Sequence, residues 1–187
     1  MKFCSQCAAE LVLRIPPGDD RERYVCSRCA MIHYHNPRII TGCLPVHERR
    51  VLLCRRAIEP RKGFWTVPCG FLECGETIAE GAARETMEEA CARVELQELY
   101  GIIDIPHISQ VYMLYRARLA DLDFAPGAES LETALFAEQD IPWQDLAFPV
   151  MNLILEHFLA ESKTGTFTLK TAKLDFSQRL RKARDDH

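Results

Sequence analysis

The sequence has no long hydrophobic run. No segment of its 187 residues approaches the roughly 18 consecutive apolar residues that a membrane-spanning helix needs. The N-terminus also lacks the apolar stretch of a secretory signal peptide, and internal repeats and low-complexity segments are missing. We therefore expect a globular cytoplasmic protein without a membrane partner.

A strong excess of one charge is also missing. The chain has 23 Lys and Arg against 27 Asp and Glu, a net charge of −4 at pH 7. This balance argues against a protein that coats nucleic acid. An anionic substrate would have to be attracted by bound cations and a few placed Arg or Lys side chains. With 48% hydrophobic residues, the chain can bury about 70% of its unfolded surface as one domain with a small appendage.

Cysteine is plentiful, with nine residues. Cys4 and Cys7 form one C-x2-C pair, Cys26 and Cys29 form another, and 18 residues lie between the pairs. This is the spacing of a four-thiolate zinc ribbon, which we place at residues 1–35. Four ligands close a tetrahedral shell, so Zn²⁺ there would be structural. The alternative is a set of free or redox-active thiols.

The remainder of the chain alternates strand and helix patterns. A hairpin is predicted at 39–46 and 51–56, and a helix at 149–161 opens on a proline. Further strands are predicted at 64–68, 94–105, 109–119 and 135–138, the last after a loop at 124–133. This pattern indicates an α/β domain at 36–163 with a mixed sheet covered by helices. From Thr164 to residue 187 we expect a solvated tail, with a basic run at 179–184.

An Ala-rich helix carries the main chemical signal. Glu85, Glu88 and Glu89 stand at positions i, i+3 and i+4, so helical periodicity brings three carboxylates onto one face. Their mutual repulsion would cost a few kcal/mol unless a cation or protons relieved it. Mg²⁺, with Mn²⁺ as a substitute, suits carboxylate, water and phosphate oxygens. The alternative is an ordinary solvated acidic face.

The stretch around this helix resembles the Nudix box, G-x5-E-x7-R-E-U-x-E-E-x-G-U, in which U is a bulky aliphatic residue. Gly70 and all five charged positions match. Thr86 and Ala92 replace aliphatic residues, and Cys91 replaces the second glycine, which normally relieves left-handed backbone strain at the helix end. The resemblance implies the Nudix α/β/α sandwich with a mixed sheet, and hydrolysis of a diphosphate bond.

The resemblance also implies residue roles. Catalytic Mg²⁺ would be ligated by Glu85, Glu88 and Glu89, while Arg84 orients a carboxylate of the box. The Gly70 carbonyl and Glu76 would complete or support the metal shell.

Nudix enzymes often add a glutamate from a loop after the box, as general base or metal ligand. Glu132, before the strand at 135–138, is our first candidate, and Glu129 is the second. The alternative is that both are solvated loop acids.

The substrate depends on residues outside the box. A zinc ribbon ahead of a Nudix box resembles the NADH pyrophosphatase branch, but Ser109-Gln110 is followed by Val111-Tyr112 instead of that branch's Pro-Trp-Pro-Phe. From Phe3 to about Gly165 the chain is more similar to the plant plastid FAD pyrophosphatase branch. This similarity implies cleavage of FAD to FMN and AMP. ADP-ribose and NADH are the alternatives.

Four aromatic residues lie near the expected site in the sequence and are candidates to stack on a substrate ring. They are Phe64, Trp65, Phe71 and Tyr112. The alternative is that each belongs to the core.

Other functions remain open. One alternative is a regulator whose ribbon binds nucleic acid or protein while the second domain senses a metabolite. The box would also suit removal of modified nucleoside triphosphates, and the family includes an isomerase that leaves its diphosphate intact. The resemblance also implies a possible homodimer.

Overall fold

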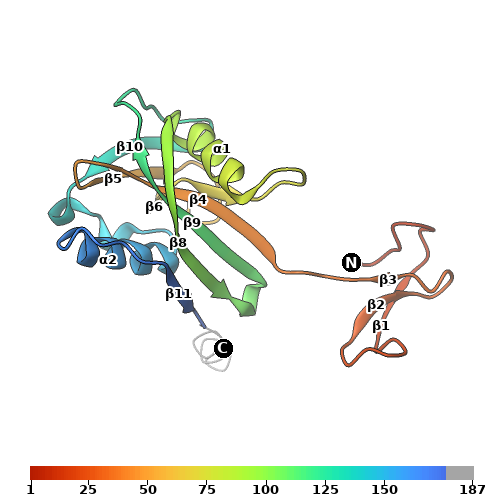
Figure 1. The fold of residues 1–187 in the computed structure, drawn as a ribbon. Helices are drawn as coiled ribbons and strands as arrows, with labels where there is room; N and C mark the ends of the chain where they lie inside the picture. The colour runs from red at the N-terminus through yellow and green to blue at the C-terminus, as the bar shows by residue number, and fades with distance from the viewer. Residues whose placement is uncertain (176–187) are drawn as a thin grey trace, which may run out of the picture. The chain divides into compact units, whose positions relative to one another are not determined.

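The computed structural model describes residues 1–175 of the chain. It divides into two compact units, Met1–Pro37 and the part from Arg38 onward (Figure 1). Within the described residues, no helix is long and apolar enough to cross a membrane.

The first unit is a three-stranded antiparallel sheet in the order β1-β2-β3. Its strands are Leu11–Arg14, Arg23–Cys26 and Ile32–His33. The Pro- and Gly-containing segment between the first two strands forms the connection. Its buried apolar residues are few, and two of the buried side chains at its centre are Cys4 and Cys26. Such a small core cannot hold a lobe of this size together without another source of stability.

The four cysteines of the first unit supply that source. Their Sγ atoms all lie within 4.8 Å of one another, with Cys7 Sγ 3.4 Å from Cys26 Sγ and 3.6 Å from Cys29 Sγ. A tetrahedral Zn²⁺ with Zn–S bonds of about 2.3 Å would place its sulfurs about 3.8 Å apart, so the cluster fits this ion. The backbone amide of Cys29 donates to Cys26 Sγ at 3.4 Å and lowers the pKa of that thiol. The thiolate form that zinc requires is therefore favoured.

His33 also contacts the cluster, with Nε2 3.4 Å from Cys4 Sγ. Its position beside a ligand sulfur is typical of a residue that orients a metal ligand.

We predict that Cys26→Ser abolishes zinc binding and unfolds the first unit, because a structural zinc site contributes roughly 10–16 kcal/mol of apparent binding energy. Zinc content by atomic spectroscopy and thermal unfolding would measure this. Cys74→Ser is the matched control, since Cys74 is an exposed free cysteine outside the cluster. A well-folded wild-type ribbon without zinc would contradict the assignment.

The second unit is built on an eight-stranded mixed sheet. The order is β10-β5-β4-β9-β8-β11, with β6 paired to β5 and β7 paired to β4. The β4/β9 and β8/β11 pairs are parallel, and the others are antiparallel. The strands are β4 Arg38–His47, β5 Arg50–Arg56, β6 Trp65–Thr66, β7 Cys69–Phe71, β8 Val94–Ile105, β9 Gln110–Leu119, β10 Ser130–Phe136 and β11 Lys170–Lys173.

Two helices cover opposite faces of this sheet (Figure 1). Helix α2, Pro149–Ser162, buries a fully apolar face that includes Met151 and Ile154 in the larger core. Helix α1, Ile78–Ala90, approaches the other face through small residues such as Ala82, which packs with Cys43 of β4. Three short 3₁₀ helices complete the unit, at Pro106–Ile108, Glu138–Asp140 and Trp143–Asp145. The α/β/α sandwich with a mixed sheet is confirmed.

The structure differs from the sequence-based prediction at two places. Strand β10 begins at Ser130 inside the predicted loop, because its residues pair with β5 from Arg56 onward. The predicted tail contributes β11, which adds to the edge of β8, and Phe167, Ala172 and Leu174 pack against the core. Partner strands that are distant in sequence decide both elements. The basic run at 179–184 lies outside the described residues.

Local sequence explains the limits of α1. Thr77 and Glu80 form a reciprocal capping box at its start. At its end Cys91 adopts a left-handed conformation with φ of 48° and donates its N–H to the Met87 carbonyl. This is the conformation that glycine adopts without steric cost.

We predict that Cys91→Gly raises the free energy of unfolding by about 0.5–1 kcal/mol, because removal of the Cβ relieves left-handed strain that exceeds the entropic cost of glycine. This corresponds to about 1–4 °C in Tm for a chain of this size. Calorimetry would measure it. Cys91→Ala, which removes the thiol but keeps the Cβ, should leave Tm nearly unchanged. A Tm that rises equally in both variants would attribute the effect to the thiol.

Candidate functional site

The second unit contains a large cavity of about 990 Å³. It lies where α1 meets β7 and extends over the ends of β4, β5 and β9 to the start of α2. Its polar and charged lining residues are Arg38, Arg56, Glu59, Glu73, Arg84, Glu85, Glu88, Glu89, His107, Gln110, Tyr112 and Glu129. Its apolar lining includes Ile40, Ile58, Pro60, Phe71, Ile105, Ile108, Phe148 and Leu174.

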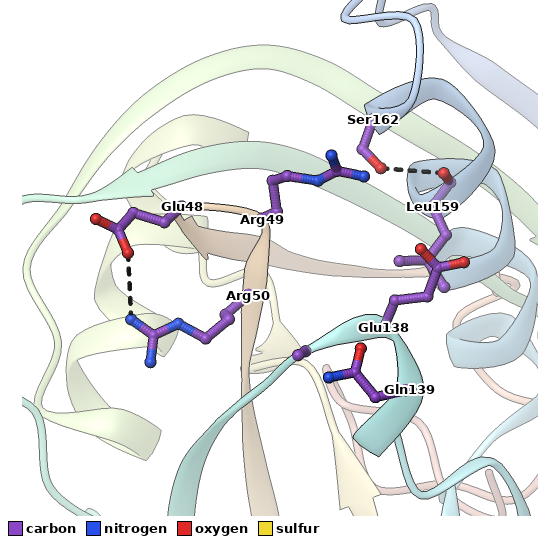
Figure 2. A pocket seen from close by; sticks show the side chains of 8 residues that line it. Glu48, Arg49, Arg50, Glu138, Gln139, Leu159 and Ser162 are labelled. Carbon is purple, nitrogen blue, oxygen red and sulfur yellow. Dashed lines mark hydrogen bonds and ion pairs between the residues drawn. The ribbon is translucent and has the colours of Figure 1, made fainter.

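A second cavity, of about 250 Å³, lies between the β4–β5 turn and the C-terminal end of α2. Figure 2 shows two interactions among its lining residues: Arg50 pairs with Glu48 at 3.6 Å, and Ser162 Oγ donates to the Leu159 carbonyl at 3.0 Å. None of the acidic residues of α1 lines it. The large cavity is therefore the candidate active site.

Helix α1 delivers three carboxylates to the large cavity. Glu85 and Glu89 are only 9% and 7% exposed, whereas the side chain of Glu88 is 58% exposed. Burial raises the pKa of Glu89 to about 8 and also raises the pKa of Glu85. Two buried carboxylates beside each other favour either protonation or a bound cation. The arrangement is unlike a solvated acidic face.

Arg84 is the centre of the hydrogen-bond network at this site. Its Nη1 donates to Glu85 Oε1 at 2.8 Å and to Glu88 Oε2 at 3.0 Å. Its Nε and Nη2 donate to the two carboxylate oxygens of Glu76 at 2.9 and 2.8 Å. The bidentate pair holds the pKa of Glu76 at about 2. Glu76 does not line the cavity, and the structure places it as a partner of Arg84.

The turn at Cys69–Gly70 closes the other side of the carboxylates. The Cys69 backbone amide donates to Glu89 Oε2 at 3.2 Å. A Cβ on Gly70 would lie 2.4 Å from Glu85 Oε2, so only glycine lets this carboxylate approach β7. A side chain of any size would occupy the space in front of Glu85.

The donor set fits a hard divalent cation, because buried carboxylate oxygens are the ligands that such ions prefer. Glu85, Glu88 and Glu89 would hold it. Within residues 1–175 only the four cysteines have all their ligand atoms within 4.8 Å of one another. The carboxylates of α1 are more spread, since Arg84 holds Glu88 and the Cys69 amide holds Glu89.

The structure separates the two glutamates that follow the box. Glu129 lines the cavity, and its charge contributes to the raised pKa values of Glu85 and Glu89. Glu132, our first candidate from the sequence, lies in β10 and pairs with Arg55 at 3.7 Å, outside the cavity lining. The predicted loop boundary placed Glu132 in the loop, whereas β10 begins at Ser130, so we now propose Glu129 as the first candidate.

Two backbone hydrogen bonds attach the loop before Glu129 to the end of α1, and sequence reasoning missed them. The Gly127 amide donates to the Glu89 carbonyl at 3.0 Å, and the Ala125 amide donates to the Ala90 carbonyl at 2.9 Å. The loop thus satisfies carbonyls at the end of α1 that would otherwise lack partners. A Cβ on Gly127 would lie 1.7 Å from the Glu88 carbonyl oxygen. In the sequence, this glycine, two residues before Glu129, was the signal from which the close contact could have been predicted.

The aromatic candidates divide in the same way. Phe71 and Tyr112 line the cavity. Phe64 and Trp65 do not: the Trp65 ring packs edge-on against Phe136 at 4.9 Å, next to the core. Sequence reasoning missed Phe148, which is far from the Nudix box in the sequence but lines the cavity immediately before α2.

Comparison with known proteins agrees with both units. Residues 2–35 match the zinc-ribbon family described as Nudix N-terminal, and residues 36–158 match the NUDIX domain. The chain is 31% identical over 138 residues to the NAD-capped RNA hydrolase NudC of Photobacterium profundum, which covers 73% of this chain and 49% of that protein. It is 33% identical over 73 residues to the ADP-ribose pyrophosphatase of Methanocaldococcus jannaschii, which covers 39% of this chain and 43% of that protein. The chain thus spans about half the length of these curated relatives.

Among solved structures, a NUDIX hydrolase from Nitrosomonas europaea is 55% identical, with a TM-score of 0.91, and the match covers 94% of this chain and 99% of that one. An ADP-ribose pyrophosphatase from Streptococcus suis shares the fold at 22% identity, with a TM-score of 0.60, over 74% of this chain and 100% of that one. The family match spans most of the chain and agrees with the Arg84-centred acidic helix. The chain belongs to the Nudix family and carries the N-terminal zinc ribbon of that family.

Proposed function

We propose that this chain hydrolyses the diphosphate bond of a nucleoside-diphosphate-linked metabolite, with Mg²⁺ or Mn²⁺ as cofactor. The observation that carries the proposal is one cavity lined by Glu85, Glu88, Glu89 and Glu129, with Arg84 bonded to Glu85 and Glu88. The negative charge of a diphosphate also supports a role for Mg²⁺ or Mn²⁺. An acidic cavity of this kind accepts an anionic diphosphate only together with cations.

The reaction adds one water across the bond. The water oxygen attacks one phosphorus, the bridging P–O bond breaks, and two phosphomonoesters leave. Glu129 lines the same cavity and accepts the proton of the attacking water in this proposal. Arg84 keeps Glu85 and Glu88 in place for the cation. The bound cation neutralises the diphosphate and lowers the pKa of water.

FAD, cleaved to FMN and AMP, is our first candidate substrate. The similarity over nearly the whole chain to the plant FAD pyrophosphatase branch supports it. A cavity of about 990 Å³ is at the upper end of the size range of ligand sites, which suits a large dinucleotide. The names of the relatives favour two further candidates, ADP-ribose and NAD-capped RNA. The resemblance of the ribbon and box to the NADH pyrophosphatase branch adds NADH.

A product-resolved screen tests the proposal. The purified chain with Mg²⁺ is compared on FAD, NADH, ADP-ribose, NAD-capped RNA and a nucleoside triphosphate by kcat/KM. FMN and AMP as the fastest products would support the first candidate, and faster cleavage of another diphosphate would replace the substrate only. Release of pyrophosphate from the triphosphate would indicate nucleotide-pool cleansing. Absence of cleavage would favour a metabolite-sensing regulator.

We predict that Glu89→Gln lowers kcat by about 10²-fold to 10³-fold, because it removes one charge from the cation site. The fold should survive, since burial already disfavours the charged carboxylate. Steady-state kinetics with a Mg²⁺ titration would measure the effect. Glu95→Gln is the matched control, because Glu95 pairs with Arg118 outside the cavity lining. Near-normal turnover by Glu89→Gln would contradict the assignment of the α1 carboxylates as cation ligands.

Glu129 and Glu132 form a second matched pair. We predict that Glu129→Gln lowers kcat by about 10²-fold to 10⁴-fold, the range for loss of a general base. Glu132→Gln should alter kcat less than twofold, because Glu132 contacts only the exposed Arg55. The pH–rate profiles of both variants would be recorded. The reverse order of effects would restore our sequence-based first candidate.

A further inference from the structure

The large cavity contains two arginine side chains that stack on phenylalanine rings. We infer that each Arg–Phe pair is a platform for a planar ring, and that together they select substrates with a ring system on both sides of the diphosphate. The inference rests on the proposed function and names the residues that decide the substrate class.

The first platform is Arg38 on Phe71. The guanidinium carbon of Arg38 lies 4.8 Å from the centroid of the Phe71 ring, and both side chains line the cavity. Phe71 is 48% exposed, so a large part of its ring remains open to a ligand. Gln110, opposite Arg38 in the β4/β9 register, also lines the cavity and offers an amide for hydrogen bonds to a ring edge.

The second platform is Arg56 on Phe148. The guanidinium carbon of Arg56 lies 5.2 Å from the centroid of the Phe148 ring, and both line the cavity. Arg56 Nε donates to the Pro60 carbonyl at 2.9 Å, which fixes the plane of the guanidinium. The apolar side chain of Ile58 lies beside them in the cavity wall. A pre-oriented planar cation loses little entropy when a ring stacks on it.

The two platforms lie at the ends of different strands of the sheet. Arg38 is the first residue of β4 and Arg56 is the last residue of β5. These strands pair with each other only at Val46–Val51 and His47–Arg50, and beyond that point β7 pairs with β4 and β6 with β5. The platforms therefore belong to separate strand ends.

Each platform also borders the acidic cluster. The Phe71 carbonyl accepts a hydrogen bond from Arg84 Nη2 at 3.2 Å, and Arg84 also bonds Glu85 and Glu88. Arg56 and Phe148 line the same cavity as Glu89. A diphosphate bound at the carboxylates would thus have one platform on the β4 side and another on the β5 side.

This arrangement matches the chemistry of a dinucleotide. Planar guanidinium groups and aromatic rings both stack on nucleobases and similar heterocycles, and the positive charge of arginine also attracts the adjoining phosphate. A dinucleotide carries two such rings and uses both platforms. ADP-ribose carries one ring and a sugar, so it can use only one.

Three leucine variants test the inference. Phe71→Leu and Phe148→Leu keep an apolar side chain but remove the ring. Phe64→Leu is the matched control, because Phe64 stacks under Arg61 at 5.2 Å in the same way and does not line the cavity. The kcat/KM values for FAD, NADH and ADP-ribose would be measured with Mg²⁺. Binding would be measured by calorimetry with Mg²⁺ and the methylene-bridged analogues of the same compounds, whose P–C–P bridge is not hydrolysed.

We expect both cavity variants to lower kcat/KM and affinity for FAD and NADH by about fivefold. For ADP-ribose only one of the two should matter, and Phe64→Leu should change nothing. Equal losses for ADP-ribose in both variants, or no loss for the dinucleotides, would overturn the inference and leave diphosphate hydrolysis standing. If the wild type cleaves none of the compounds, the proposed function fails, and the calorimetric pattern alone decides whether the platforms bind rings.

Discussion

The like charge of three carboxylates on one turn of helix is the constraint on which the second unit depends. Glu85 and Glu89 are buried beside each other, and burial raises the pKa of both. Arg84 provides the fixed positive charge that makes the arrangement tolerable, and Glu76 in turn holds Arg84 with both carboxylate oxygens. Arg84 therefore neutralises only part of the negative charge of this site, and cations are needed to neutralise the rest. Replacement of this arginine by lysine would lose the fork that reaches Glu76 and Glu85 together.

Close backbone contacts set the rest of the geometry. Gly70 brings β7 against Glu85, and Gly127 brings the loop before β10 against the end of α1. These contacts work together, because the loop amides occupy the last carbonyls of the same helix whose side chains form the site. The loop that positions Glu129 is therefore hydrogen-bonded to the end of α1. The acidic residues of the helix and of the loop thus belong to one connected site.

The parts of the fold that local patterns encode were predictable, and the parts that distant contacts decide were not. The cysteine pairs and the i, i+3, i+4 glutamates need only spacing, and α1 and β8 follow from periodicity. Strand β10 and strand β11 exist because of their partners β5 and β8, which no local window contains. For the same reason the sequence did not show that, of Glu129 and Glu132, Glu129 is the one that lines the cavity. Arg38, Arg56 and Phe148 were missed because they meet only in the folded cavity.

The two metal sites show opposite solutions to ion binding. In the ribbon, four sulfurs within 4.8 Å of one another saturate a tetrahedral ion and leave no position for a substrate. In the cavity, Arg84 Nη1 bonds both Glu85 and Glu88, the Cys69 amide bonds Glu89, and all three glutamates line open space. A cation there must complete its shell with water or phosphate oxygens. The ribbon site can therefore stabilise the chain and nothing more, whereas the cavity site has the incomplete shell that chemistry on a diphosphate requires.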